Sequence, residues 1–175
     1  MFKKLLPLLL ISFFVVLTSC QNNQESSMDK QRKAAYVEIN RLIDAGEVDG
    51  LDAYIAENAV DHQLDPTMTD KNGLAGIKEM LGKFHKAVPD MHSIVHSMAV
   101  SGDTLFGYVT TTGTTSEPFM GMPANSKMTM NAVDIVRFDG SKMVEHWGFM
   151  DIADVMKMMP KPEMKEENMM KNKSK

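Results

Sequence analysis

This chain has a single cysteine and fewer basic than acidic side chains. Cys20 is its one cysteine, which excludes an internal disulfide and leaves the globular part without a thiol nucleophile. The 19 Lys and Arg residues are outnumbered by 23 Asp and Glu residues, for a net charge of −4. An acidic domain has little attraction for nucleic acid or for an anionic lipid surface, so we expect neither as a partner.

Metal-binding patterns are also missing from the sequence. His92 and His96 fall on one face of a predicted strand, but two alternations separate them, too far to chelate one ion. His85 falls on a predicted helix beside lysines, where we expect it to face solvent. We therefore predict no metal site.

The first 20 residues have the pattern of an export signal. Lys3 and Lys4 precede the apolar run 5–17, which is too short for a comfortable membrane span. The run ends in Leu-Thr-Ser-Cys, which resembles a bacterial lipobox. This resemblance implies cleavage before Cys20, lipid on its thiol, and a domain that is anchored to a membrane of the cell envelope outside the cytoplasm. The alternative is an ordinary secreted protein with a chance cysteine.

The rest of the chain is long enough for one domain with a full core. Removing 1–19 leaves 156 residues, and without Lys3 and Lys4 there are 17 basic against 23 acidic side chains, a net charge of −6. We predict a flexible tether at 20–29, a single domain at 30–159 and a frayed polar tail at 160–175.

Helical periodicity dominates the first half of the domain. Apolar stripes predict helices at 30–45, ended by Gly46, at 50–58, and at 72–88 with Asn72 as N-cap. Strands follow at 92–100, 104–115, 127–138 and 143–150, and a last short helix at 151–159. Helices first and then a run of antiparallel strands indicate an α+β fold, with the helices on one face of a bent sheet.

The last two strands carry an unusual number of ionisable residues around an Asp-Gly turn. These residues are Asp134, Arg137, Glu145, His146 and Asp151. Because an unpaired buried charge is costly, they must be paired or solvated in a cavity.

Pairing Phe138 with Lys142 would put Asp134 opposite His146. A slip by one residue would put Asp134 opposite Glu145, which is repulsive. We favour the first register. Asp134 and His146 are then either a plain cross-strand pair or part of a reactive site.

Short motifs recur in order along the domain: A-V-D-H at 59–62, P-D-M-H at 89–92, S-G-D at 101–103, T-G-T at 112–114, F-M-G-M-P at 119–123 and V-D-I-V-R-F-D-G-S-K-M-V-E-H-W-G-F-M-D at 133–151. This ordered series resembles the SnoaL-like polyketide cyclases, also called ester cyclases, of the NTF2-like superfamily. The resemblance implies a cone in which about three N-terminal helices pack on the concave face of a strongly bent antiparallel sheet. It also implies a small apolar or polyketide-like ligand, and it allows a homodimer through the outer face of the sheet.

The chemistry implied by this resemblance is intramolecular aldol ring closure without a metal or an organic cofactor. A base removes a proton next to a carbonyl, and an adjacent acid stabilises the enolate. Our first candidate for the base is Asp151, followed by His146, as acid or orienting partner, and Asp134. Asp151 has the alternative role of capping the last helix. The predicted pocket residues are Trp147, Phe149, His62, Met130 and Tyr54, and Asp61 could supply a further wall; plain core is the alternative for Trp147.

Three functions remain open at this stage. The chain is a small-molecule cyclase, isomerase or hydrolase, a lipoprotein that binds an apolar ligand without turning it over, or a Cu(I)-handling protein. The third function depends on a methionine cluster near the C-terminus, because thioethers bind Cu(I). We prefer the alternative that these methionines belong to a helix face and the tail and bind no metal. The cluster comprises Met156, Met158, Met159, Met164, Met169 and Met170.

The predicted lipid anchor is directly testable. Replacing Cys20 by serine removes the thiol that would carry the lipid, so the Cys20→Ser protein is expected to leave the membrane fraction and to become soluble. Fractionation of cells that express either form measures this. A Cys20→Ser protein that still partitions into membranes would contradict the prediction.

Overall fold

The protein is described by a computed structural model that covers residues 25–158. In this part of the chain the elements follow one another as two helices, a first strand, another helix, four strands and a last short helix. They are α1 (Ser27–Ala45), the 3-10 helix η1 (Val48–Ala53), β1 (Ile55–Asp61), α2 (Gly73–Ala87), β2 (His92–Ser101), β3 (Thr104–Thr114), β4 (Lys127–Asp139), β5 (Lys142–Met150) and α3 (Ile152–Met158).

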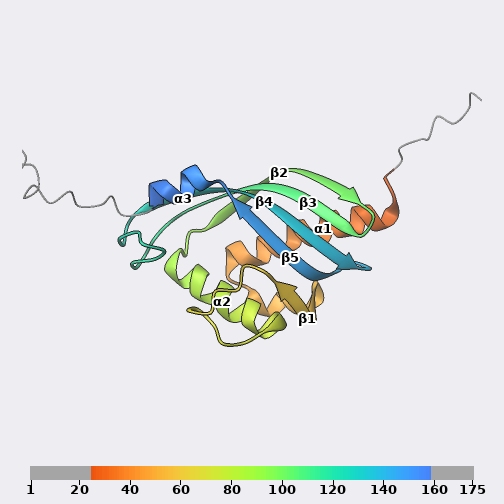
Figure 1. Cartoon of the computed structure of the whole chain (residues 1–175), viewed down its shortest axis with the longest axis horizontal. Helices are drawn as coiled ribbons and strands as arrows, with labels where there is room; N and C mark the ends of the chain where they lie inside the picture. Colours follow the sequence, from red (N-terminus) through yellow and green to blue (C-terminus); the bar gives the residue numbers. More distant parts are fainter. Residues whose placement is uncertain (1–24, 159–175) are drawn as a thin grey trace, which may run out of the picture.

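The strands form one sheet in the order β1-β5-β4-β3-β2, and Figure 1 shows it curving over α1 and α2. The predicted α+β class and the placement of the N-terminal helices on one side of the sheet are confirmed, whereas α3 lies at the far end of β4. The sheet is mixed, however, because β1 lies parallel to β5, whereas the other neighbours are antiparallel. The expectation of a wholly antiparallel sheet was wrong at this edge, where the early strand β1 adds to the last strand of the chain.

Helix α1 begins slightly earlier than predicted and ends where expected. The Ser26 side chain accepts a hydrogen bond from the Asp29 backbone N–H at 3.0 Å, which caps the first turn. Gly46 ends the helix in the left-handed conformation with φ of 70°. Tyr36 and Ile39 are among the residues of α1 that are buried against the sheet.

The predicted second helix, 50–58, is only half correct. The chain forms η1 and then turns into β1, with Ile55 opposite Met143 of β5. The Met143 backbone N–H donates to the Tyr54 carbonyl at 2.8 Å. Pairing with the free edge of β5 satisfies the backbone hydrogen-bonding groups of β1. This gain outweighs the helical periodicity of the apolar residues in 50–58.

The β4–β5 hairpin has a different register from the predicted one. Asp134 lies opposite Gly148, and Val136 lies opposite His146. A register shift follows Arg137, because Phe138 pairs with Met143. The displacement from the predicted pairing is two residues, so every side chain here keeps its predicted face. Asp134 and His146 are diagonal neighbours on one face.

A second irregularity changes the face of β2. The register shifts between Val95 and Ser97, so His96 is the extra residue. Val95 and Met98, three residues apart, both pack against the core. The strand therefore does not alternate strictly beyond Val95.

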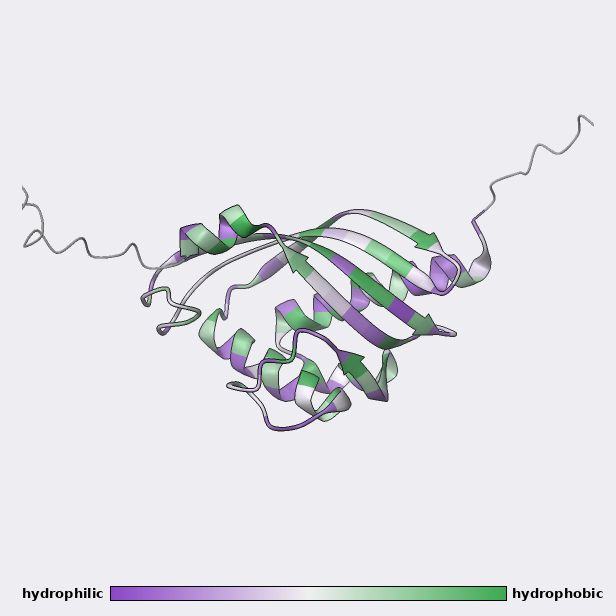
Figure 2. Ribbon diagram, viewed as in Figure 1, coloured by the Kyte–Doolittle hydropathy of each residue, from purple (hydrophilic) through white to green (hydrophobic). Residues whose placement is uncertain are grey.

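Two apolar clusters form the interior. The larger lies between the sheet and the helices and includes Leu51, Leu105 and Phe138, all with under 3 % exposure. The smaller gathers methionines, among them Met91, Met122 and Met128, at the other end of the sheet. Figure 2 shows hydrophobic and hydrophilic residues alternating along the strands, as a sheet with one covered face requires. Among residues 25–158 no helix is long and apolar enough to span a membrane.

Gly107 in β3 makes room for an aromatic ring. A Cβ at this position would lie 2.7 Å from both Cζ and Oη of Tyr36, closer than carbon and oxygen atoms can approach. Gly107 is also the β3 partner of Asp134. Its missing side chain therefore lets the Tyr36 ring pack closely against β3 and reach Asp134 of β4.

The Gly107→Ala protein is expected to lose about 1–3 kcal/mol of unfolding free energy, because the rigidly held ring must move. Gly82→Ala is the matched control: its Cβ would meet nothing within 4 Å on the surface of α2, and alanine favours a helix. Urea unfolding of the three proteins measures both effects. Equal stability of Gly107→Ala and wild type would refute the close packing.

Candidate functional site

A cavity of about 430 Å³ lies between the concave face of the sheet and helices α1 and α2. Its volume suits a small organic ligand. Most of its wall is apolar, and its polar side chains are Tyr36, Asn40, Asp61, Gln63, Asp65, Ser93, Thr111, Asp134 and His146.

Methionines make up much of the apolar wall. Thioether side chains are flexible and polarisable, and they make favourable contacts with aromatic rings. The wall can therefore adapt to the shape of a ligand. These methionines are Met68, Met80, Met91, Met120, Met130, Met143 and Met150.

Strand alternation decides which residues of the hairpin reach the cavity. His146, Gly148 and Met150 of β5 line it, and so do Asp134 and Met130 of β4. Their odd-numbered neighbours on β5 point to the opposite face. The predicted pocket residue Met130 and the predicted acid–base residues His146 and Asp134 thus line the same cavity.

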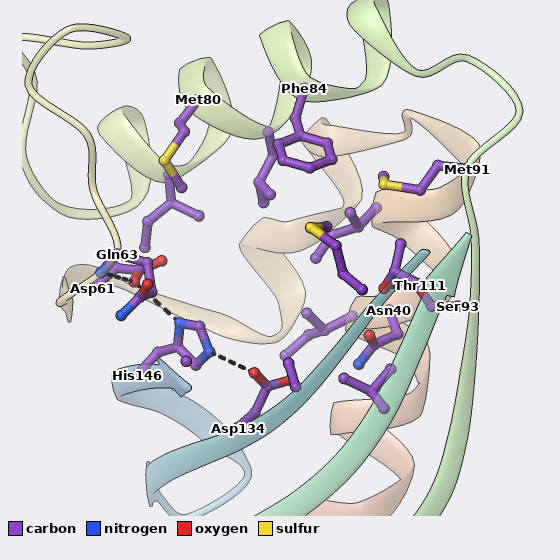
Figure 3. A pocket seen from close by; sticks show the side chains of 18 of the residues that line it. Asn40, Asp61, Gln63, Met80, Phe84, Met91, Ser93, Thr111, Asp134 and His146 are labelled. Atoms are coloured by element: carbon purple, nitrogen blue, oxygen red, sulfur yellow. Dashed lines mark hydrogen bonds and ion pairs between the residues drawn. The ribbon is translucent and has the colours of Figure 1, made fainter. Parts of the chain in front are cut away.

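His146 lies between two carboxylates in the cavity wall, as Figure 3 shows. Its Nδ1 is 3.0 Å from Asp61 Oδ1, and its Nε2 is 3.4 Å from Asp134 Oδ1. Asp61 is the residue that pairs directly with His146 across the parallel β1–β5 edge. The side chains of Asp61, Asp134 and His146 retain 6 %, 16 % and 21 % exposure, so solvent screens their charges only partly.

The surroundings of His146 keep its ring charged. Burial opposes the imidazolium, but the hydrogen bonds and charges of Asp134 and Asp61 outweigh burial and raise the pKa of His146 to about 9. At neutral pH both ring nitrogens carry a proton and donate one to each carboxylate. The site holds a cation that can face a developing negative charge.

Tyr36 is a functional candidate that the sequence reasoning missed. Its Oη donates to Asp134 Oδ2 at 2.5 Å across the space left by Gly107. Burial, together with the negative charge of Asp134, raises the pKa of Tyr36, so the phenol keeps its proton and fixes the carboxylate. In the sequence Tyr36 is one of several apolar-stripe residues, and nothing there indicates its partner 98 positions away.

Three predicted pocket residues lie outside the cavity, on the other face of the sheet. Trp147 stacks on His62 with ring centroids 4.7 Å apart, and Phe149 is 57 % exposed. His62 Nε2 lies 3.0 Å from Glu145 Oε1, and Arg137 binds the other oxygen of Glu145. The hydrogen bonds from His62 and Arg137 lower the pKa of Glu145. The alternation of β5 explains the misplacement, because residues next to His146 face away from it.

Tyr54 also lies away from the cavity wall and packs against the larger core cluster. Cys20 lies outside the described residues.

Asp151, the first candidate for the base, caps α3. Its Oδ1 accepts from the Ala153 backbone N–H at 2.8 Å, and its side chain is exposed and does not line the cavity. This is the alternative that the sequence allowed. Asp61 was predicted only as a possible further wall of the pocket, but it is the residue that binds His146 Nδ1. His85 is half-buried rather than solvent-facing, since it packs against Gly46.

Within residues 25–158 no group of three or more His, Cys, Asp and Glu side chains has the geometry to hold a metal ion. The cluster of His146, Asp61 and Asp134 is therefore described by its hydrogen bonds and charges alone.

A bent sheet and helices that enclose a ligand-sized cavity, with ionisable groups in its wall, define an NTF2-like α+β cone. Residues 33–159 match the family model described as SnoaL-like polyketide cyclase. The chain therefore belongs to this family, as its motifs indicated.

Solved structures share this fold. TsrD from Streptomyces laurentii is 18 % identical, with a TM-score of 0.65 over 74 % of this chain and 94 % of its own. Wild-type IdmH from Streptomyces antibioticus is 24 % identical, with a TM-score of 0.62 over 73 % and 97 %. A SnoaL-like polyketide cyclase from Agrobacterium tumefaciens is 17 % identical, with a TM-score of 0.60 over 71 % and 94 %. No curated protein matches the sequence.

The raised pKa of His146 predicts a pH-dependent stability. Between pH 6.5 and about 9 the folded state holds a proton that the unfolded state releases, so unfolding free energy falls as pH rises, on the order of 3 kcal/mol in total. Urea unfolding of wild type and His146→Gln across this range measures it. The difference between the two proteins should shrink with rising pH, and a constant difference would contradict the imidazolium.

Proposed function

We propose that this protein is a cofactor-independent acid–base enzyme that acts on a small, mostly apolar carbonyl compound held in the cavity. The observation that carries the proposal is the His146 imidazolium between Asp61 and Asp134 in an otherwise apolar wall. An acid and a base at one point of a mostly apolar cavity wall are what proton abstraction next to a carbonyl requires.

Asp134 is the base in this proposal. It takes the proton from the carbon next to the carbonyl: the C–H bond breaks, an O–H bond forms on the carboxylate, and the electron pair moves onto the carbonyl oxygen. His146 donates a hydrogen bond to that oxygen. Its contact with Asp134 is long, at 3.4 Å, so a ligand oxygen can share the same N–H.

The proton on Asp134 then returns to the product. In an isomerisation it goes to another carbon of the same molecule. In an aldol ring closure the enolate carbon bonds to a second carbonyl carbon of the same molecule, and the proton ends on the new hydroxyl. Neither outcome needs an electron acceptor.

Asp61 and Tyr36 act as positioning residues. Asp61 accepts from His146 Nδ1 and is itself fixed by the Gln63 backbone N–H at 2.8 Å. Tyr36 holds one oxygen of Asp134 and leaves the other near His146. The arrangement fixes a carboxylate and an imidazolium at one point of the wall, which lowers the entropic cost of reaction.

The ligand class follows from the apolar wall and from the family. A methionine-rich surface favours flat or flexible apolar molecules, and the relative from Agrobacterium tumefaciens is described as a SnoaL-like polyketide cyclase. We propose a polyketide-like carbonyl compound for this protein.

Ligand binding without turnover is the second candidate. It is favoured by the completeness of the cluster, since both ring nitrogens of His146 and both oxygens of Asp134 are already hydrogen-bonded within the protein. A site of this kind is stable without a substrate and can serve recognition alone.

We also propose that the domain is tethered to a membrane of the cell envelope through lipid on Cys20, which the sequence pattern supports. A homodimer through the outer face of the sheet is supported by the large apolar side chains exposed there. These are Ile94, Phe106, Tyr108, Val133 and Phe149.

The Asp134→Asn protein is expected to lose turnover by about a hundredfold or more, because an amide cannot accept the proton. The measurement is mass spectrometry of small molecules from the source organism, incubated with each purified protein, following both consumed and retained compounds. Circular dichroism first establishes that the variant is folded.

Asp151→Asn is the informative comparison, since asparagine also caps helices. A compound consumed by wild type and by Asp151→Asn, but only retained by Asp134→Asn, supports the proposal. Loss of turnover in Asp151→Asn alone would overturn it in favour of the exposed carboxylate. A compound retained unchanged by all three proteins would show the binding function instead.

A further inference from the structure

A second polar group lies in the same cavity, away from His146, and the proposed chemistry does not use it. It consists of Asn40 from α1, Ser93 from β2 and Thr111 from β3, which Figure 3 shows on the other side of the cavity. We call these three residues the distal site.

The hydrogen bonds of the distal site have a fixed direction. The carboxylate of Asp44 accepts from the Ser93 backbone N–H at 2.7 Å and from Ser93 Oγ at 2.8 Å. A serine hydroxyl has one proton, and here it is given to Asp44. The 3.0 Å contact between Ser93 Oγ and Thr111 Oγ1 must therefore use the proton of Thr111. Thr111 then offers only lone pairs to the cavity.

Asn40 presents a second acceptor. Its Nδ2 donates to the Tyr36 backbone carbonyl at 2.9 Å, which fixes the orientation of the amide because a carbonyl can only accept. The same amide also acts on the Tyr36 phenol as a hydrogen-bond donor, which opposes the rise in the phenol's pKa, so Oδ1 is the atom of Asn40 that can accept from a ligand. Thr111 Oγ1 and Asn40 Oδ1 are thus both acceptors in the cavity wall.

Thr111 lies well apart from Asp134, whereas Asn40 is one helical turn from Tyr36, which binds Asp134. Gly107 is the β3 neighbour of Asp134, and Thr111 lies four residues further along the same face of β3, a backbone separation of roughly 13 Å. The buried Val109 lines the wall between them. A molecule that touches both places is elongated and apolar in the middle.

We infer that the distal site selects ligands that carry a hydrogen-bond donor, a hydroxyl or an N–H, at the end opposite the reacting carbonyl. This inference rests on the proposed function, which places the carbonyl at His146. The ligand class becomes an elongated apolar molecule with a carbonyl at one end and a hydroxyl at the other. A ligand with an ether or ketone at the distal end would place oxygen lone pairs against those of Thr111 and Asn40.

Three related compounds test the inference by isothermal titration calorimetry at neutral pH. The first is 6-acetyl-2-naphthol, the second is its methyl ether, and the third is 2-acetylnaphthalene, which has no distal substituent. Wild type is expected to bind the naphthol roughly five- to tenfold more tightly than the methyl ether, the value of one neutral hydrogen bond. The Thr111→Val protein should lose this preference, because valine has the same shape and no acceptor.

Thr112→Val is the matched control. Thr112 is the next residue of β3 and faces the other side of the sheet, so this variant should keep the preference of wild type. If wild type binds naphthol and ether equally, or if Thr111→Val keeps the preference, the inference is wrong.

The failure of the proposed function looks different from the failure of this inference. If wild type binds 2-acetylnaphthalene and His146→Gln binds it more weakly, the carbonyl site at His146 is supported, even where the distal site shows no preference. If wild type binds none of the three compounds, the cavity is not a site for such carbonyl ligands, and both proposals fall.

Discussion

One partly buried cation links four elements of the structure. The His146 imidazolium on β5 is held by Asp61 at the end of β1 and by Asp134 on β4, and Asp134 is held in turn by Tyr36 of α1. A buried charge is tolerable only when its partners are fixed in good geometry. Elements α1, β1, β4 and β5 must therefore pack together for this charge to be paired. Asp61 reaches His146 because β1 pairs with β5 in parallel at these two residues. The same requirement explains Gly107, since any larger residue would keep the Tyr36 ring from Asp134.

The ionisable residues of the β4–β5 hairpin serve two separate surfaces. Asp134 and His146 face the cavity, whereas Arg137 and Glu145 pair on the outer face, where His62 joins them and stacks on Trp147. Alternation along the strands keeps the two sets apart, so neither disturbs the charge balance of the other. The pair of Arg137 and Glu145 on the outer face is more exposed, so its electrostatic contribution to stability is small. The carboxylates on the cavity side are less exposed and keep His146 protonated.

The cavity combines an adaptable wall with directional ends. Its methionines can follow different ligand shapes, but the hydrogen bonds near His146 and around Thr111 have fixed donors and acceptors. Selectivity in such a site comes from the polar ends, because an apolar wall discriminates weakly between molecules of similar size, whereas an unmatched polar group is costly. We thus propose that His146 and Asp134 carry out the reaction and that the residues around Thr111 recognise the far end of the ligand.

The sequence by itself determined the α+β class, most element positions and the face of the hairpin that carries Asp134 and His146, because periodicity and turn residues act locally. Its motifs also indicated the family. Tertiary structure alone decided that 55–58 extends as an edge strand, that the hairpin register is displaced by two residues, and that Asp151 caps α3 outside the cavity. It also brought Tyr36 and Asp61 to His146. These outcomes depend on pairing between segments as many as 98 residues apart. Which backbone edge is free, and which side chain meets a buried charge, is settled only when those segments pack together.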